Sequence, residues 1–546
     1  MNGRDSDAPR IRGVAWQRVA ALLSAALLVG SMAFAQQGGS ATVSFQDDIS
    51  TLDPQVGYDW QNWSIIKTIF DGLMDYVPGT TELVPHLAES YDVSEDGLTY
   101  TFNLRQGVLF HNGRELVADD VRYTFERVLD PATQSPGQGF YTTIAGAQEF
   151  IDGEADSVAG VEVVDDYTVR ITTSEPDASF LHKMGLNFAH IVPQEAVEAA
   201  GGDFGHNPVG TGGFMLKEWV LGQRVVLERN PNYFEEGLPY LDEMVFQVGV
   251  DPNVAFLRLL QGEVDVLGDG IPSARFTEVM DDPDLSQQVA RGEQMQTGYV
   301  TINVNMEPFD DVRVRQALNM AINKDRIVRL INNRAVPATQ ILPPLFESHN
   351  ADYAGYPYDP EAARELLAEA GYPNGFDTEL YAYNVAPNDR IAQAIQADLA
   401  EIGVNVALRT QAQSTVIEAG GAGEAPLIWS GGMAWIADYP DPNNFYWPIL
   451  ACASNIPGGW NWARYCNEDL EARAARADTL ARADQQEARV AEWRDIFMEI
   501  MEEAPWIPIF HELQVSMHST NVTGPSAIFV DPMHIPVHYE MVRKAE

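Results

Sequence analysis

The sequence predicts a mixed α/β protein with more than one domain. Strand and helix patterns alternate from the start of the chain to its end, with no internal repeat and no low-complexity linker. The 546 residues include 45% hydrophobic and 10% aromatic side chains. That is enough apolar surface for several cores, and it is too much for a disordered chain.

The first 35 residues have the pattern of a cleaved secretory signal peptide. Four arginines, ending with Arg18, precede the apolar run 19–29, and a small-x-small cleavage site follows at 33–35. The run is shorter than the roughly 20 residues of a membrane-spanning helix, so an uncleaved anchor is the weaker alternative. No cysteine follows the site, which argues against a lipoprotein. We expect the mature chain to begin near Gln36.

The chain is strongly acidic, with 34 Lys and Arg against 79 Asp and Glu and a formal net charge of −45. Removal of residues 1–35, which hold four Arg and two Asp, changes this charge to −47. Binding to nucleic acid requires a dense basic surface, and so does electrostatic docking on anionic lipid. Neither nucleic acid nor a charged membrane surface is therefore an expected partner.

Three elements are predicted in the first third of the chain. Apolar residues at 98, 100, 102 and 104 alternate with polar ones after the turn at 95–97, which predicts a strand. Asp119 is expected to cap a helix with an apolar face at 121, 125, 128 and 129. The segment 161–171 predicts a hairpin with its turn at 165–166.

Three further elements follow. Val300, Ile302 and Val304 alternate as in a strand. Asp359 and the proline after it predict the start of a helix that Gly371 ends. Residues 484–487 have the pattern of a capping box, and an apolar stripe at 490, 493, 497, 500 and 501 follows it. We interpret the stripe as core packing and the stretch 471–489 as a solvated helix surface.

Motifs of catalysis are missing. The sequence has no GxSxG, HExxH or GxxxxGK[ST] pattern, and its many carboxylates single out no catalytic pair. His534 and His538 are four residues apart, but the proline between them argues against one helix face, so we read them as ordinary surface or strand histidines. The chain is therefore not expected to be an enzyme, to carry a metal or to need a cofactor.

Cys452 and Cys466 are the two cysteines of the chain, and the Pro-Gly-Gly between them can turn it back. In an oxidising compartment one disulfide around a short loop is expected. The alternative is two unrelated buried thiols.

Aromatic side chains gather around this loop. Nine lie within residues 429–465: Trp429, Trp435, Tyr439, Phe445, Tyr446, Trp447, Trp460, Trp462 and Tyr465. Such a group fits a small-molecule pocket and a local aromatic core equally well. A carboxylate at a pocket wall, such as Asp438 in this stretch, would select an amine or another cation.

Five segments together resemble the peptide/dipeptide/nickel group of extracytoplasmic solute-binding proteins, family 5, which serve ABC transporters. They are residues 83–113, 207–214, 230–234, 309–318 and 435–445, and the likeness runs over nearly all of the mature chain. The resemblance implies a two-lobed fold like that of the periplasmic binding proteins (cluster C), with an extra inserted domain and the ligand held between the lobes. Lobe one would comprise 36–71, 206–299 and 507–546, the inserted domain 72–205 and lobe two 300–506, with hinges near Tyr299 and near Pro505-Trp506.

The resemblance also implies the binding residues. Asp438, in the Trp-x-x-Asp segment, would accept the free α-amino group of a peptide, with Trp435 and Tyr439 beside it. Arg390 is the candidate for the ligand carboxylate. Tyr58 and Trp60 would form facing walls on lobe one. The cysteine pair at 452 and 466 favours the dipeptide branch. The nickel branch is less expected, because no histidine accompanies the pocket segment.

The expected function is that of a monomeric periplasmic protein that captures short peptides by hinge closure. It would deliver them to the permease subunits of an inner-membrane ABC importer and their ATPases. An alternative keeps the fold but binds another small solute, such as an opine, glutathione, an oligosaccharide or a nickel chelate. A remote alternative is a secreted hydrolase.

Overall fold

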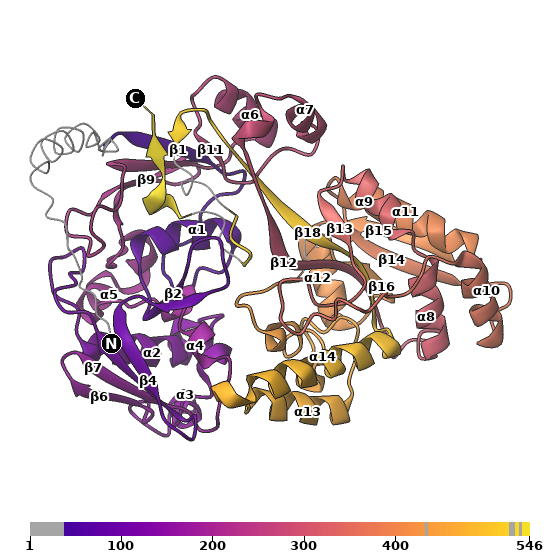
Figure 1. Cartoon of the computed structure of the whole chain (residues 1–546), viewed down its shortest axis with the longest axis horizontal. Coiled ribbons are helices and arrows are strands. Elements are labelled where there is room, and N and C mark those ends of the chain that lie inside the picture. Colours follow the sequence, from indigo (N-terminus) through magenta and orange to yellow (C-terminus); the bar gives the residue numbers. More distant parts are fainter. Residues whose placement is uncertain (1–37, 432–434, 524–529, 534–537, 546) are drawn as a thin grey trace, which may run out of the picture.

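The computed structural model describes residues 38–431, 435–523, 530–533 and 538–545. Two lobes are joined by a pair of long strands, β12 (Val289–Ile302) and β18 (Trp506–His518), which cross the middle of the molecule (Figure 1). We call residues 38–288, on the indigo and magenta side, the first lobe, and residues 303–505, on the orange side, the second lobe.

The two long strands bring the expected hinge segments together. They run antiparallel from the pair Val289–Met517 to the pair Thr301–Trp506. Near the second end the rings of Tyr299 and Trp506 stack with centroids 3.6 Å apart. Both crossings between the lobes therefore lie side by side in one ladder.

One mixed sheet of twelve strands extends through both lobes. Its order is β15 (Asn405–Gln411), β14 (Asp377–Tyr383), β16 (Leu427–Trp429), β12, β18, β11 (Val266–Leu267), β1 (Ser40–Ser44), β10 (Glu243–Gln247), β9 (Arg224–Arg229) and β8 (Phe214–Val220). Off this path, β13 (Ala335–Pro337) pairs with β18, and β17 (Trp435–Ile436) pairs with β12. The strand expected at 300–304 is thus the end of β12, which stops at Ile302.

A separate four-stranded sheet lies within the first lobe, in the order β4 (Ala88–Val93), β5 (Thr99–Leu104), β7 (Thr168–Thr172) and β6 (Val161–Asp165). It confirms the predicted strand at 98–104 and the hairpin at 161–171, although the turn lies at 166–167, one residue later than predicted, because Asp165 still pairs with Thr168. Two small sheets pair β2 (Met74–Tyr76) with β3 (Leu83–Pro85) and β19 (Val522–Thr523) with β20 (Arg543–Lys544).

Helices cover both lobes. Those of the first are α1 (Trp60–Ile69), α2 (Ala118–Leu129), α3 (Ala147–Ile151), α4 (Phe180–Lys183), α5 (Gln194–Ala200), α6 (Pro252–Leu260) and α7 (Phe276–Asp281). Those of the second are α8 (Val312–Ala321), α9 (Lys324–Leu330), α10 (Pro360–Glu369), α11 (Asn388–Glu401), α12 (Gln413–Ala422), α13 (Glu468–Asp478) and α14 (Gln486–Glu503). In the described part of the chain no helix is both long and apolar enough to span a membrane.

The helix ends test the predicted caps. Asp359 caps α10, because its side chain accepts from the backbone of residues 361 and 362, as predicted. The cap predicted at Asp119 is wrong. Helix α2 begins one residue earlier, and the carboxylate of Asp120 instead accepts from the backbone N–H of Val117. Asp120 also pairs with Arg114 at 2.5 Å, and this ion pair helps to hold its carboxylate at the helix start.

The capping box predicted at 484–487 is also wrong, because the Gln485 side chain accepts from the backbone N–H of Arg482 at 3.3 Å, just ahead of α14. The apolar stripe of α14 is core, as predicted. Trp493, Phe497 and Ile500 are buried there.

Candidate ligand-binding site

The segment that carries Asp438 is presented by the long central strands. Strand β17 pairs with β12 at Gln296 and Thr297, and the Ala437 N–H donates to the Met295 carbonyl at 2.9 Å. Beyond Asp438 the chain enters a short 3-10 turn, Pro442–Phe445, capped by the side chain of Asp441. Asp438 therefore stands between a strand and a capped turn, which together hold its position.

Asp438 is a buried carboxylate held by neutral donors. It is 4% exposed. The Tyr58 hydroxyl donates to its Oδ1 at 2.8 Å, and Asn444 Nδ2 donates to its Oδ2 at 2.9 Å. Its own N–H donates to Asn444 Oδ1 at 3.0 Å. No Lys, Arg or His in the described ranges forms a salt bridge with it.

The electrostatics of Asp438 follow from this setting. Burial raises the pKa of its carboxyl to about 6, while the hydrogen bonds from Asn444 and Tyr58 oppose that rise. At neutral pH the group is charged and lacks a cationic neighbour. A ligand ammonium would supply the missing charge, because an unpaired buried charge is costly.

Asp438 lies on the wall of a cavity of about 530 Å³ between the lobes. Residues 136–183 of the first lobe and 435–479 of the second line it. Trp435, Tyr439 and Trp447 contribute aromatic walls, together with Phe140 from the first lobe. Apolar walls with a few fixed polar groups are typical of small-molecule sites.

The two aromatic residues expected beside Asp438 are found there. Trp435 is half-buried, and its Nε1 donates to Asn444 Oδ1 at 3.2 Å. The buried ring of Tyr439 meets Phe140 edge to face, with centroids 6.0 Å apart. Asn444 therefore links Trp435 to Asp438. Sequence reasoning missed this role, although Asn444 lies inside the segment 435–445.

Of the two residues expected to form the first-lobe wall, Tyr58 contacts Asp438 but is not among the residues that line the cavity. Tyr58 is 39% exposed, yet its hydroxyl reaches Asp438, and its ring lies against Trp63 and Phe188 with centroids 5.5 and 5.3 Å away. Desolvation and the nearby carboxylate keep the pKa of Tyr58 well above 10, so the phenol stays neutral and donates. Trp60 begins α1, but its side chain lies outside the described residues.

Arg390 is placed differently. It is exposed in the first turn of α11, and it is not among the residues that line the cavity around Asp438. Its neighbours Asn388 and Ile391 line a second cavity of about 520 Å³. Asp269 of the first lobe and Arg334 of the second also line that cavity.

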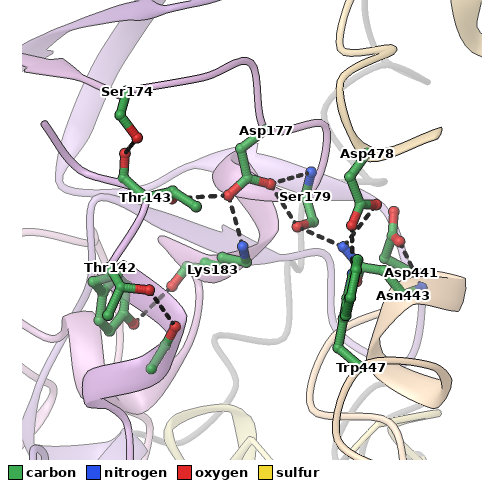
Figure 2. Close-up of polar contacts among 12 residues, drawn as sticks. Thr142, Thr143, Ser174, Asp177, Ser179, Lys183, Asp441, Asn443, Trp447 and Asp478 are labelled. Carbon is green, nitrogen blue, oxygen red and sulfur yellow. Dashed lines mark hydrogen bonds and ion pairs between the residues drawn. The ribbon is translucent and has the colours of Figure 1, made fainter. Parts of the chain in front are cut away.

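A polar network joins the two lobes beside the first cavity (Figure 2). Asp177 of the first lobe holds Lys183 at 2.6 Å, and Ser179 donates to the same carboxylate at 2.7 Å. Asn443 Nδ2 from the second lobe donates to Ser179 Oγ at 3.0 Å and to Asp478 Oδ1 at 3.1 Å. Burial would raise the pKa of Asp177, but the Lys183 ammonium brings it below its usual range. Asn443 lies in the segment 435–445, but no sequence pattern pointed to the other residues of this network.

Arg489 corrects the interpretation of residues 471–489 as a solvated surface. It is 3% exposed, and its Nη2 lies 2.8 Å from Asp441 and 3.4 Å from Asp478. The helix face that carries it meets the buried carboxylate of Asp441 and the partly buried carboxylate of Asp478 rather than water.

The aromatic stretch 429–465 serves both of the roles left open by the sequence. Trp429, Phe445, Tyr446, Trp462 and Tyr465 are buried in hydrophobic clusters, whereas Trp435, Tyr439 and Trp447 line the cavity. Cys452 and Cys466 are joined by a disulfide, as expected. Trp460, within that loop, meets Trp435 with centroids 6.3 Å apart.

His538 is buried between Asp531 and Glu540, 3.4 and 3.0 Å away, and lies outside the strands. The expectation of a surface or strand histidine is therefore wrong for this residue. His534 lies outside the described residues. Among the residues whose placement is described, no group of three or more His, Cys, Asp or Glu is arranged to hold a metal ion.

Comparison with known proteins places this geometry in a family. The sequence profile of the bacterial extracellular solute-binding proteins, family 5 Middle, matches residues 82–456. Heme-binding protein A of Haemophilus influenzae is 34% identical over 478 residues, which cover 84% of this chain and 84% of that protein. The dipeptide-binding protein of Escherichia coli is 33% identical over 486 residues, which cover 85% and 87%.

A solved structure of a periplasmic binding protein has a similar fold. The ABC transporter-associated periplasmic binding protein DppA from Helicobacter pylori, in complex with the peptide STSA, has a TM-score of 0.78 and 27% identity. The match covers 94% of this chain and 99% of that one. The expected two-lobed α/β fold is therefore confirmed. The chain belongs to the bacterial extracellular solute-binding proteins of family 5.

Proposed function

We propose that this protein captures short peptides between its lobes and delivers them to an inner-membrane ABC importer. The observation that carries the proposal is Asp438, a buried carboxylate on the wall of a cavity of about 530 Å³, with no salt bridge in the described part of the chain. A free α-ammonium is the ligand group that such a site selects. The relatives named as a dipeptide-binding protein and as a peptide complex support this ligand class.

Capture would occur by hinge closure about β12 and β18. Lobe one would comprise 36–71, 206–299 and 507–546, the inserted domain 72–205, and lobe two 300–506. The strand order supports this division, because β1 and β8 to β11 lie on one side of the long pair and β14 to β16 on the other. The contact between Tyr58 and Asp438 crosses the lobes, as a closing contact must.

We also propose where the protein works and with which partners. The chain would be exported with cleavage near residue 35, would work as a monomer in the periplasm and would catalyse no reaction. Its partners would be the permease subunits and their ATPases. Arg390 stays our candidate for the ligand carboxylate, supported by its place on α11 beside the second cavity, and Trp60 stays a proposed wall residue.

A second candidate function keeps the site and changes the solute. A relative that is 34% identical is named as a heme-binding protein, so members similar to this chain bind ligands other than peptides. The aromatic walls of the cavity, Phe140, Trp435, Tyr439 and Trp447, suit a flat apolar ligand as well as a peptide side chain.

One experiment decides between these ligands. The mature protein, residues 36–546, is purified without added ligand and denatured, and the released small molecules are identified by mass spectrometry. The protein refolded without ligand is then titrated calorimetrically with Ala-Ala, Ala-Ala-Ala and heme. We expect released short peptides and saturable peptide binding without hydrolysis. Release of another solute, with no heat from either peptide, would contradict the proposal, and peptide turnover would point to the hydrolase.

A further inference from the structure

The cavity that holds Asp438 has more negative charge on its wall than one α-ammonium requires. Its lining includes the carboxylates of Glu175, Asp177, Asp438 and Asp478 and the ammonium of Lys183. Lys183 is already held by Asp177, with Nζ 2.6 Å from Oδ2. The lining therefore retains an excess of carboxylates after this pair is set aside.

Asp478, at the end of α13, is placed to bind a second positive charge. Trp447 Nε1 donates to its Oδ2 at 2.6 Å and Asn443 Nδ2 to its Oδ1 at 3.1 Å (Figure 2). Arg489 lies 3.4 Å from Asp478 but is held more closely, at 2.8 Å, by Asp441. Burial and the charge of Asp441 raise the pKa of Asp478 to about 7. The positive charge already nearby thus does not offset the cost of ionising this group.

Asn443 gives an observation independent of charge. It is 2% exposed and lines the same cavity, and its Oδ1 has no hydrogen-bond partner among the residues the structure describes. Its Nδ2 donates to Ser179 and to the Asp478 carboxylate, which identifies the nitrogen end of the amide, because a carboxylate needs a donor. An N–H group of a ligand would supply the donor that the buried oxygen lacks.

Aromatic rings complete the wall. Phe140, Trp435, Tyr439 and Trp447 line the cavity along with the carboxylates. The faces of such rings attract ammonium and guanidinium groups, and attract guanidinium most often. Carboxylates, an unsatisfied acceptor and aromatic rings together define a site for a cation that also donates hydrogen bonds.

We propose that this cavity is a subsite for a cationic side chain, a guanidinium or an ammonium, on the first residue of the ligand. The inference rests on the proposed peptide-binding function and names the ligand class that the site prefers. The α-ammonium at Asp438 is bonded to the α-carbon that bears this side chain, so the side chain starts at the cavity wall. Asp438 binds the α-ammonium, and Asp478 and Asn443 bind the positive charge of the side chain.

The test compares peptides that differ only in charge. Isothermal titration calorimetry of the mature protein at neutral pH measures Kd for Arg-Ala and for citrulline-Ala, whose urea group has the same shape without the charge. We expect Arg-Ala to bind about 10- to 100-fold more tightly, the range for hydrogen bonds to charged groups. Ala-Arg and Ala-citrulline, with the charge on the second residue, are expected to differ less than about 3-fold, within the range of exposed charge pairs.

Variants locate the subsite. Asp478→Asn should bring the Kd values of Arg-Ala and citrulline-Ala within about 3-fold of each other. Asp156→Asn, which removes the same charge from an exposed position, should preserve the difference. Retention of the full Arg-Ala preference in Asp478→Asn would overturn the assignment.

The two proposals fail in different ways. If Ala-Ala binds the wild-type protein but Arg-Ala has no advantage over citrulline-Ala, the cation subsite is refuted and peptide binding stands. If none of these peptides binds, peptide binding itself is refuted, and the subsite with it. The comparison in the wild-type protein decides the question even if Asp478→Asn does not fold.

Discussion

The Asp438→Asn substitution tests whether this carboxylate recognises a ligand ammonium. Asp438 is buried, and its two oxygens accept from Tyr58 and Asn444, both neutral. Removal of one member of a buried charge pair costs about 3–5 kcal/mol. The affinity for peptides with a free amino terminus should therefore fall about 100-fold or more. The affinity for N-acetylated peptides, which have no charge at this position, should change less than about 3-fold.

The same substitution should affect stability in the opposite direction. Burial raises the pKa of Asp438 from 3.8 to about 6, and a rise of about 2 pH units corresponds to about 3 kcal/mol. Because the raised pKa belongs to an acid, this cost is absent below about pH 4, develops between about pH 4 and 6, and is complete above that. Asparagine avoids it at pH 7, although its amide then meets the donor of Asn444. The ligand-free variant should be as stable as the wild type, or more stable by up to about 3 kcal/mol.

Two measurements check this reasoning. Calorimetry compares Ala-Ala with N-acetyl-Ala-Ala for the wild type, for Asp438→Asn and for the exposed control Asp156→Asn. Urea unfolding of the ligand-free proteins gives their free energies of unfolding. Equal losses of affinity for the free and acetylated peptides would refute the assigned role of Asp438. A loss of stability as large as the loss of affinity would show that the residue is structural.

Three further outcomes are expected. The affinity for free-amine peptides should fall about tenfold per pH unit below about pH 6, as Asp438 becomes protonated, and a flat calorimetric profile would contradict this. Replacing Cys452 and Cys466 by serine should lower the free energy of unfolding by about 3 kcal/mol for a loop of 14 residues, and an unchanged urea midpoint would speak against it. Arg489→Met leaves the buried carboxylate of Asp441 without its cation and should cost about 3–5 kcal/mol at pH 7, whereas exposed Arg482→Met should cost under about 1 kcal/mol. Similar urea midpoints for the two variants would disprove the difference.

Much of the local structure could be predicted from the sequence. The hairpin at 161–171 and the start of the helix at Asp359 depend on contacts within a few residues, which the sequence lists directly. The cap predicted at Asp119 is wrong, although the residues involved are close together in the chain. Asp119 is the cap that the pattern predicts, whereas in the structure the Asp120 carboxylate accepts the Val117 N–H and pairs with Arg114.

Only some residues of the candidate site could be predicted from the sequence. The Trp435–Phe445 segment could be recognised because the carboxylate and its aromatic neighbours lie within eleven consecutive residues. The donor Tyr58 could be proposed only as a facing wall, since it is 380 residues from Asp438 in the chain. Asn443 also lies in the Trp435–Phe445 segment, but Asp177 and Asp478 had no sequence signal, because each of them alone is a common polar side chain.

The sequence by itself determined the α/β class, the family resemblance and the segment that carries Asp438. These depend on short-range periodicity and on runs of neighbouring residues. Only the tertiary structure decided that Asp438 has neutral partners, that Arg489 is buried and that Asn443, which lines the cavity, has a side-chain oxygen without a hydrogen-bond partner among the described residues. Burial and charge pairing depend on which distant segments meet, and the free energy of a charged group is set by that surrounding rather than by its neighbours in the chain.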